Sequence, residues 1–167
     1  YLADLTHDTI GLATEVFPLN IGFIASYCKS IFKEEIVVKL FKYPIKLEKA
    51  ILKEPPDIIA ISNYPWCHNL SLEILALTAK VKPERIRVMG GPNFPHDSQS
   101  QIEFLKFRKI IDTYIYLEGE NGFANLVKLV KENGLKPVRD SLKCNPVPGC
   151  IHLSQDNKLL STEDTGR

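Results

Sequence analysis

Short apolar runs alternate along the chain with longer segments whose apolar residues recur at helical spacing. The short runs are typical of strands, and they cover residues 1–6, 35–41, 57–62, 85–89 and 113–117. The periodic segments predict helices over residues 19–32, 45–53, 70–80, 99–107 and 122–131. Within residues 57–62 the apolar positions do not alternate, which is typical of a central strand buried on both faces.

Strands interleaved with helices predict an α/β fold with a doubly wound sheet. Right-handed crossovers restrict the possible topologies. Among them we expect five parallel strands in the flavodoxin-like or Rossmann-like order 2-1-3-4-5, with helices on both faces. Ligands of such sheets bind outside the carboxyl ends of the strands. The loops over residues 6–18, 62–69, 90–98 and 118–122 should therefore meet around one crevice.

The composition changes after residue 134. Residues 135–167 are rich in proline, asparagine, serine, aspartate and lysine, with two short apolar patches. This composition is typical of connecting segments. We therefore expect a ligand-binding domain over residues 1–134, and a linker with one hairpin over residues 135–167 that leads to a downstream domain.

Charge and cysteine content narrow the function classes. Twenty-one basic and twenty acidic residues give a net charge of +1, which argues against nucleic acid or an anionic membrane as the main partner. No apolar stretch is long enough to span a bilayer. The four cysteines form no Cys-x-x-Cys pair, so neither a disulfide framework nor a structural zinc site is expected. Cys28 fits a buried apolar position, and a reduced, cytoplasmic setting fits best.

The predicted binding edge is rich in hydrogen-bonding groups, glycine and aromatic rings, which suits a large polar ligand. Two adjacent glycines after a buried strand indicate close approach of a ligand to the backbone. Capping of the last helix is an equally good interpretation of the two glutamates. The candidate ligand-binding residues are His7, Asp8, Ser62, Asn63, Tyr64, Trp66, Gly90, Gly91, Pro92, Glu118, Gly119 and Glu120.

Several catalytic motifs are absent from the sequence. There is no Gly-x-Ser-x-Gly elbow, no Gly-x-Gly-x-x-Gly after the first strand and no Gly-x-x-x-x-Gly-Lys-Ser/Thr. Acyl transfer by a serine nucleophile, an ordinary dinucleotide site and a P-loop are therefore disfavoured, and no catalytic residue is assigned.

Four stretches carry a family resemblance: Phe-Pro-Leu-Asn-Ile-Gly at 17–22, Pro-Asp-Ile-Ile-Ala-Ile-Ser-Asn-Tyr at 56–64, Val-Met-Gly-Gly-Pro-Asn-Phe-Pro at 88–95 and Glu-Gly-Glu at 118–120. In this order and spacing the chain resembles the cobalamin-binding N-terminal domain of B12-dependent radical SAM proteins. The resemblance implies that cobalamin lies across the carboxyl edge of the sheet. It also implies that Ser62 and its neighbours, with Gly90 and Gly91, accommodate the nucleotide tail and the corrin edge.

The resemblance further implies a C-terminal radical SAM domain as the partner of this one. That domain would carry a [4Fe–4S] cluster and S-adenosylmethionine, and the parent protein would be a radical SAM enzyme, such as a methyltransferase. The cysteine motif that holds such a cluster is absent from this sequence, so this domain would bind cobalamin without completing a reaction.

One departure concerns the metal. Many B12-binding domains carry Asp-x-His-x-x-Gly after the first strand, and its histidine coordinates cobalt. Here Asp4, His7 and Gly11 are spaced one residue too far apart on each side of the histidine. B12 domains attached to radical SAM modules generally lack that ligand. We therefore expect cobalamin without a protein ligand, with His7 as the alternative axial ligand.

Two other functions stay open at this point. The first is a non-catalytic ligand-binding or sensing module of the same fold. The second is a flavodoxin-like domain that binds a flavin, although the loop after the first strand lacks the dense serine, threonine and glycine that would hold a flavin phosphate.

Overall fold

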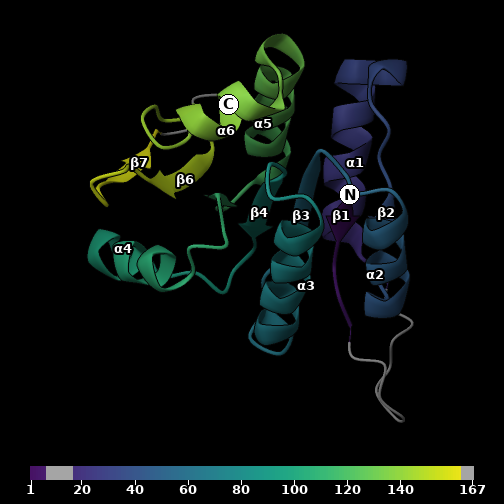
Figure 1. Ribbon diagram of the computed structural model, residues 1–167, viewed down its shortest axis with the longest axis horizontal. Coiled ribbons are helices and arrows are strands. Elements are labelled where there is room, and N and C mark those ends of the chain that lie inside the picture. Colours follow the sequence, from purple (N-terminus) through teal and green to yellow (C-terminus); the bar gives the residue numbers. More distant parts are fainter. Residues whose placement is uncertain (7–16, 163–167) are drawn as a thin grey trace.

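The structure, a computed structural model, describes residues 1–6 and 17–162, which form a three-layered α/β fold (Figure 1). Within these ranges one sheet has the order β2-β1-β3-β4-β5-β6-β7. The strands are β1 (Leu2–Ala3), β2 (Leu40–Phe41), β3 (Ile58–Ser62), β4 (Ile86–Gly90), β5 (Thr113–Ile115), β6 (Cys150–Leu153) and β7 (Leu159–Ser161). The first five are parallel and have the predicted order, whereas β6 and β7 pair antiparallel.

Five of the helices lie close to the positions that the periodicity predicts, whereas the sixth, α6, falls in the segment that was predicted to be a linker. They are α1 (Leu19–Phe32), α2 (Pro44–Lys53), α3 (His68–Val81), α4 (Ser98–Phe107), α5 (Gly119–Asn133) and α6 (Leu135–Ser141), with a short 3₁₀ turn at Lys33–Glu35. Pro44 occupies the first turn of α2, where its missing N–H costs nothing. The Asp97 side chain caps α4 by accepting a hydrogen bond from the Ser100 N–H (2.9 Å). None of the described helices is long and apolar enough to cross a membrane.

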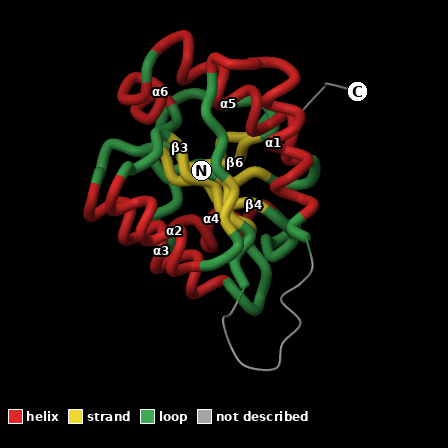
Figure 2. Tube along the Cα trace, turned by 90° about the vertical axis from the view of Figure 1, so that its right-hand side faces the viewer, coloured by secondary structure: helices red, strands yellow, loops and turns green. Residues whose placement is uncertain are grey.

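Two apolar cores lie on opposite faces of the sheet. In Figure 2 the strands lie between α1 and α5 on one side and α2 and α3 on the other. Because side chains alternate along a strand, neighbouring residues contribute to different cores. The core under α1 and α5 includes Leu2, Ile21, Cys28, Ile58, Val88, Ile115, Phe123 and Leu126. The core under α2, α3 and α4 includes Ala3, Leu47, Ile51, Ile59, Ile61, Leu75, Met89, Leu105 and Tyr114.

The prediction of a five-stranded, all-parallel sheet was wrong, because β6 and β7 extend it to seven mixed strands. Both strands are short, and the buried positions of β6 include a histidine. The His152 ring is 1% exposed, with its nitrogens next to Thr113 Oγ1 (3.2 Å) and the Asn145 carbonyl oxygen (3.0 Å). A buried histidine whose nitrogens are hydrogen-bonded interrupts the apolar pattern by which a strand is predicted from the sequence. The hairpin turns at Asn157, whose φ of 58° suits asparagine.

Residues between 135 and 150 pack into the core beneath α5. Val138, Leu142, Val147 and Cys150 are all buried there. A Cβ added to Gly122 would lie 2.6 Å from the Gly149 carbonyl oxygen, so α5 and this segment are in close backbone contact. The boundary between a domain over 1–134 and a linker over 135–167 stays a prediction.

Candidate functional site

A cavity of about 650 Å³ opens at the carboxyl edge of the parallel strands. It lies on the α1 and α5 side of the sheet, where Ser62 and Gly90 end β3 and β4. Two residues earlier on the same strands, Ala60 and Val88 line its deeper part. That deeper part is apolar, and it also includes Leu2, Ile24, Ile115 and Phe123. Polar side chains gather at the strand ends, and they are Asn20, Ser62, Tyr64, His96, Tyr116, Glu118 and Glu120.

Most of the residues predicted from the sequence are brought together here. The cavity is lined by Ser62, Tyr64, Gly90, Gly91, Pro92, Glu118, Gly119 and Glu120. Asn63 and Trp66 do not line it. The Asn63 side chain is fully buried beneath the strand ends, and Trp66 is 64% exposed. His7 and Asp8 lie outside the described residues.

The structure explains why glycine occupies the two positions at the end of β4, Gly90 and Gly91, and the sequence alone did not reveal this explanation. A Cβ on Gly90 would lie 2.9 Å from the Ile115 carbonyl oxygen. Gly91 has a φ of 115°, and its Cβ would lie 3.1 Å from the Asn63 carbonyl oxygen. Close approach of neighbouring backbone therefore demands glycine at both positions. Contact between these glycines and a ligand stays a prediction.

The side chain of Asn63 joins the loops that follow β3 and β4. Its Nδ2 donates to the Asn93 carbonyl oxygen (2.6 Å) and to Tyr114 Oη (3.2 Å), while its Oδ1 accepts from Asn93 Nδ2 (3.3 Å). Tyr114 Oη in turn donates to the Gly91 carbonyl oxygen (2.8 Å). Burial, the largest cause, raises the pKa of Tyr114, so its hydroxyl stays a donor. This network fixes the loop of Gly91 at the cavity rim.

His68 supports the same network from the opposite face of the sheet. Arg108 Nε donates to His68 Nε2 (2.9 Å), so the ring proton lies on Nδ1, which is 2.7 Å from Asn63 Oδ1. Burial and then the positive charge of Arg108 lower the pKa of His68. The neutral imidazole is therefore the form that the folded protein favours.

We expect this histidine to make the stability depend on pH. Below about pH 6.5, the ordinary pKa of histidine, the unfolded chain binds a proton at His68 before the folded protein does. The free energy of unfolding should therefore decrease as the pH falls from about 7 to about 5. Urea unfolding across this range should give a smaller decrease for His68→Gln than for the unchanged protein. Some pH dependence should remain, since burial also lowers the pKa of His152. An equal decrease of the free energy of unfolding in both proteins would contradict the assignment of His68 as a source of the pH dependence.

A polar corner joins α1 to the end of β3. Asn20 Nδ2 donates to Ser62 Oγ (2.9 Å) and reaches Tyr64 Oη at 3.4 Å. The Tyr64 ring stacks on Trp66 with centroids 4.8 Å apart and an 8° interplanar angle. Burial raises the pKa of Tyr64. Asn20 was not among the predicted site residues; an amide among the otherwise apolar or glycine residues 19–25 at the start of α1 was the signal that could have identified it.

The first turn of α5 forms another wall of the cavity. Glu118 occupies the N-cap position, but its side chain makes no capping hydrogen bond. A Cβ on Gly119 would lie 2.9 Å from Ile24 Cδ1, so this glycine lets α5 approach α1. The N–H groups of a first turn have no partners within the helix, and they favour anionic groups such as phosphate. The wall thus offers backbone donors beside two carboxylates.

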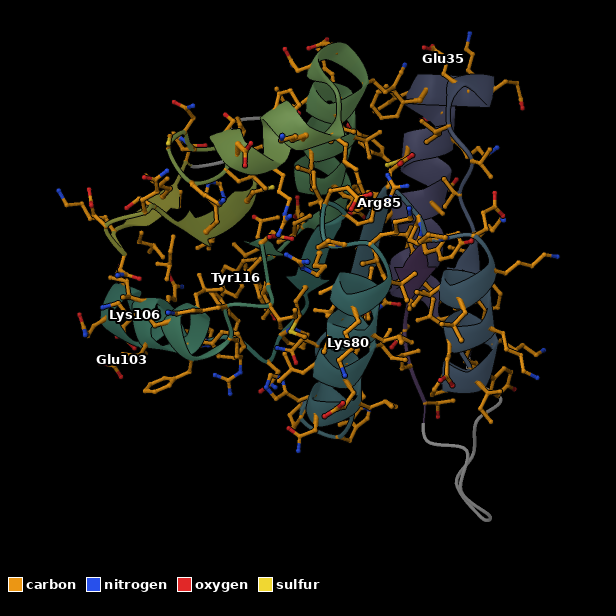
Figure 3. All side chains as sticks on the ribbon, viewed as in Figure 1. Glu35, Lys80, Arg85, Glu103, Lys106 and Tyr116 are labelled. Carbon is orange, nitrogen blue, oxygen red and sulfur yellow. The ribbon has the colours of Figure 1, made fainter. Side chains whose placement is uncertain are left out.

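His96 and Tyr116 were missed by the sequence analysis. Tyr116 Oη lies 2.6 Å from His96 Nδ1, and both side chains line the cavity. Figure 3 places Tyr116 between the edge of the sheet and α4. Their separation of twenty residues gives no local pattern from which the pair could be predicted.

Other reactive groups are few in the described part of the chain. No cluster of three or more histidine, cysteine, aspartate or glutamate side chains in residues 1–6 and 17–162 could hold a metal ion by itself. Cys28 is fully buried in the core under α1 and α5, as predicted, and burial raises the pKa of its thiol to about 11. The cavity thus consists of hydrogen-bonding groups around an apolar interior.

No protein-family model matches the chain, and no curated protein matches it. Among solved structures it is similar to part of OxsB, a cobalamin-dependent S-adenosylmethionine radical enzyme with aqua-cobalamin and S-adenosylmethionine bound. The TM-score is 0.69 at 20% sequence identity, and the match covers 98% of this chain and 22% of OxsB. The likeness is one of fold. It confirms the α/β architecture, and it extends through β6 and β7 as well as the parallel strands.

Proposed function

We propose that this chain is the cobalamin-binding domain of a cobalamin-dependent radical SAM enzyme. The observation that carries the proposal is the cavity between the sheet and helices α1 and α5, which opens where the parallel strands end. The corrin would lie across that edge, against the loops of Tyr64, Gly91 and Glu118. The nucleotide tail would enter the cavity.

The chemistry of the cavity suits such a tail. Its volume of about 650 Å³ is in the usual range for sites that enclose an organic ligand. The apolar interior around Ala60, Val88 and Phe123 suits a flat aromatic base, which gains from leaving water. Ser62 and Asn20 at the strand end offer hydrogen-bonding groups that suit the sugar.

The role of the parent protein rests on the resemblance in sequence and on the likeness to OxsB. When bound, cobalamin supplies a cobalt centre that carries a group to be transferred, such as methyl. In this chain the residues bind and orient the cofactor and keep its tail away from water. A downstream radical SAM domain with a [4Fe–4S] cluster and S-adenosylmethionine would complete the enzyme. The present chain spans 22% of OxsB's length, so the reaction and substrate belong to the whole protein.

The direct test compares two corrinoids, cobalamin and cobinamide, the second of which lacks the nucleotide. Cobalamin should co-elute with the protein in gel filtration at about 10 µM, and its affinity should exceed that of cobinamide by about tenfold or more. The physical reason is that only cobalamin can fill the apolar cavity. Failure to retain cobalamin, or equal affinity for both corrinoids, would contradict the proposed binding mode. If the purified protein were instead yellow from a bound flavin, the alternative of a flavin-binding domain would be favoured.

A further inference from the structure

A second cavity, of about 440 Å³, lies at the opposite edge of the sheet, where the parallel strands begin. Ile58, the first residue of β3, lines it, together with the segments that precede β2 and β3, residues 35–39 and 54–57. Ala60 and Ser62, the next alternate residues along β3, line the first cavity. Because alternate residues of a strand share a face, the two cavities lie on the same face of the sheet and approach each other from its two edges.

One face of α5 lines both cavities. Glu120 and Phe123, near the start of the helix, line the first cavity. Phe123 also lines the second, where Val127 and Val130 follow it along the helix. A spacing of three or four residues places these four side chains on one face of α5. Phe123 is therefore the residue of this helix at which the two cavities meet.

Two buried side chains separate the cavities. Among the described residues, only Leu2 of β1 and Phe123 line both. Their exposed fractions are 1% and 6%, and both belong to the core under α1 and α5. Backbone packs against the turn of α5 that carries Phe123, since a Cβ on the adjacent Gly122 would lie 2.6 Å from the Gly149 carbonyl oxygen. This close contact prevents α5 from moving away from the sheet, so Leu2 and Phe123 form a fixed partition between the cavities.

We propose that this partition sets the length of the nucleotide base that the domain accepts, with Phe123 as the specificity-determining residue. This inference rests on the proposed function. Leu2 pairs in register with Ala60, so the partition lies beside the space proposed for the base. A base one ring longer would have to displace Phe123 from a packed core, which is unfavourable. The domain should therefore select corrinoids whose base has two fused rings, such as the dimethylbenzimidazole of cobalamin.

The test compares cobalamin with naphthimidazolylcobamide, a corrinoid whose base has a third fused ring in place of the two methyl groups. In equilibrium binding, the unchanged protein should bind naphthimidazolylcobamide about tenfold or more weakly than cobalamin, because the partition leaves no space for the extra ring. Phe123→Ala should join the two cavities and raise the affinity for naphthimidazolylcobamide relative to cobalamin by about tenfold or more. Phe123→Leu removes fewer atoms, so it should change this ratio in the same direction by a smaller factor.

Phe32→Ala is the matched control. Phe32 lies in the same core and is also 6% exposed, but it lines neither cavity. Its loss should destabilise the fold, as the loss of Phe123 does, and leave the ratio of the two affinities unchanged. An equal change of the ratio in Phe32→Ala and Phe123→Ala would show that selectivity follows the general packing of the core, which overturns the assignment of Phe123.

The outcomes separate the two proposals. Equal affinity of the unchanged protein for the two corrinoids, or a ratio that neither substitution of Phe123 changes, overturns the assignment of Phe123 and leaves cobalamin binding intact. Failure to bind cobalamin, or equal affinity for cobalamin and cobinamide, overturns the proposed function and this inference with it. The comparison on the unchanged protein needs no substitution, so its result is independent of how the variants fold.

Discussion

Replacing Ala60 by phenylalanine should abolish cobalamin binding while the protein stays folded. Ala60 is half-buried in the middle of β3, and it lines the deep, apolar part of the cavity opposite Val88. A phenylalanine there would occupy the space proposed for the nucleotide base. Because the added ring extends into a cavity, overpacking of the core should be small. We expect cobalamin affinity to fall at least about 100-fold in equilibrium binding, about 3 kcal/mol or more.

Two controls make this prediction specific. Ala79→Phe introduces the same side chain on α3, on the opposite face of the sheet, and should leave cobalamin affinity unchanged. Cobinamide should bind Ala60→Phe and the unchanged protein equally, because it has no tail to exclude. Cobalamin bound by Ala60→Phe with undiminished affinity would show that the tail lies elsewhere.

The parallel part of the fold was predictable because its signals are local. The first four of the five residues of β3 are apolar, and α1 begins and ends at the residues that periodicity predicts. The handedness of crossovers restricted the possible orders of β1 to β5 without any knowledge of side-chain contacts, and the flavodoxin-like order chosen among them is the one observed. The edge strands β6 and β7 were not predictable in this way. A hairpin was expected in residues 135–167, but its three- and four-residue strands gave no signal that they join the sheet, where they are held by pairing to β5 and by bonds such as that between His152 and Thr113.

The sequence predicted the location of the candidate site, the carboxyl edge of the sheet, better than it predicted which side chains line it. Eight of the predicted residues line the cavity because parallel strands must end together. Asn63 faces the other way and supports the rim from below, since consecutive residues point to opposite faces. Asn20, His96 and Tyr116 come from segments whose meeting depends on packing at a distance. The sequence analysis chose Gly90 and Gly91 as positions where a ligand could approach the backbone. The structure shows another cause, because a Cβ at either position would crowd the neighbouring backbone of the protein itself.

A buried ion pair next to the cavity strands should produce the largest loss of stability. The guanidinium group of Arg87 on β4 is only 4% exposed, and its Nη2 donates to Asp112 Oδ1 (2.8 Å). The other carboxylate oxygen of Asp112 accepts from the Arg87 backbone N–H (2.8 Å). Arg139 Nε, from α6, also donates to this carboxylate (3.3 Å). Asp112 therefore joins β4, β5 and the segment after residue 134.

Asp112→Ala should lower the free energy of unfolding by about 3–5 kcal/mol in urea at neutral pH, because it leaves the Arg87 charge buried without its counter-ion. The matched control is Asp57→Ala, which removes a pair of the same types at the same 2.8 Å distance, Asp57 with Arg85. The Asp57 side chain is 73% exposed, so its loss should cost no more than about 1 kcal/mol. An equal decrease in the free energy of unfolding of the two variants would contradict the view that burial makes the loss of the Arg87–Asp112 ion pair more costly. Because Asp112 does not line the cavity, the folded fraction of Asp112→Ala should bind cobalamin with undiminished affinity, the reverse of the Ala60→Phe result.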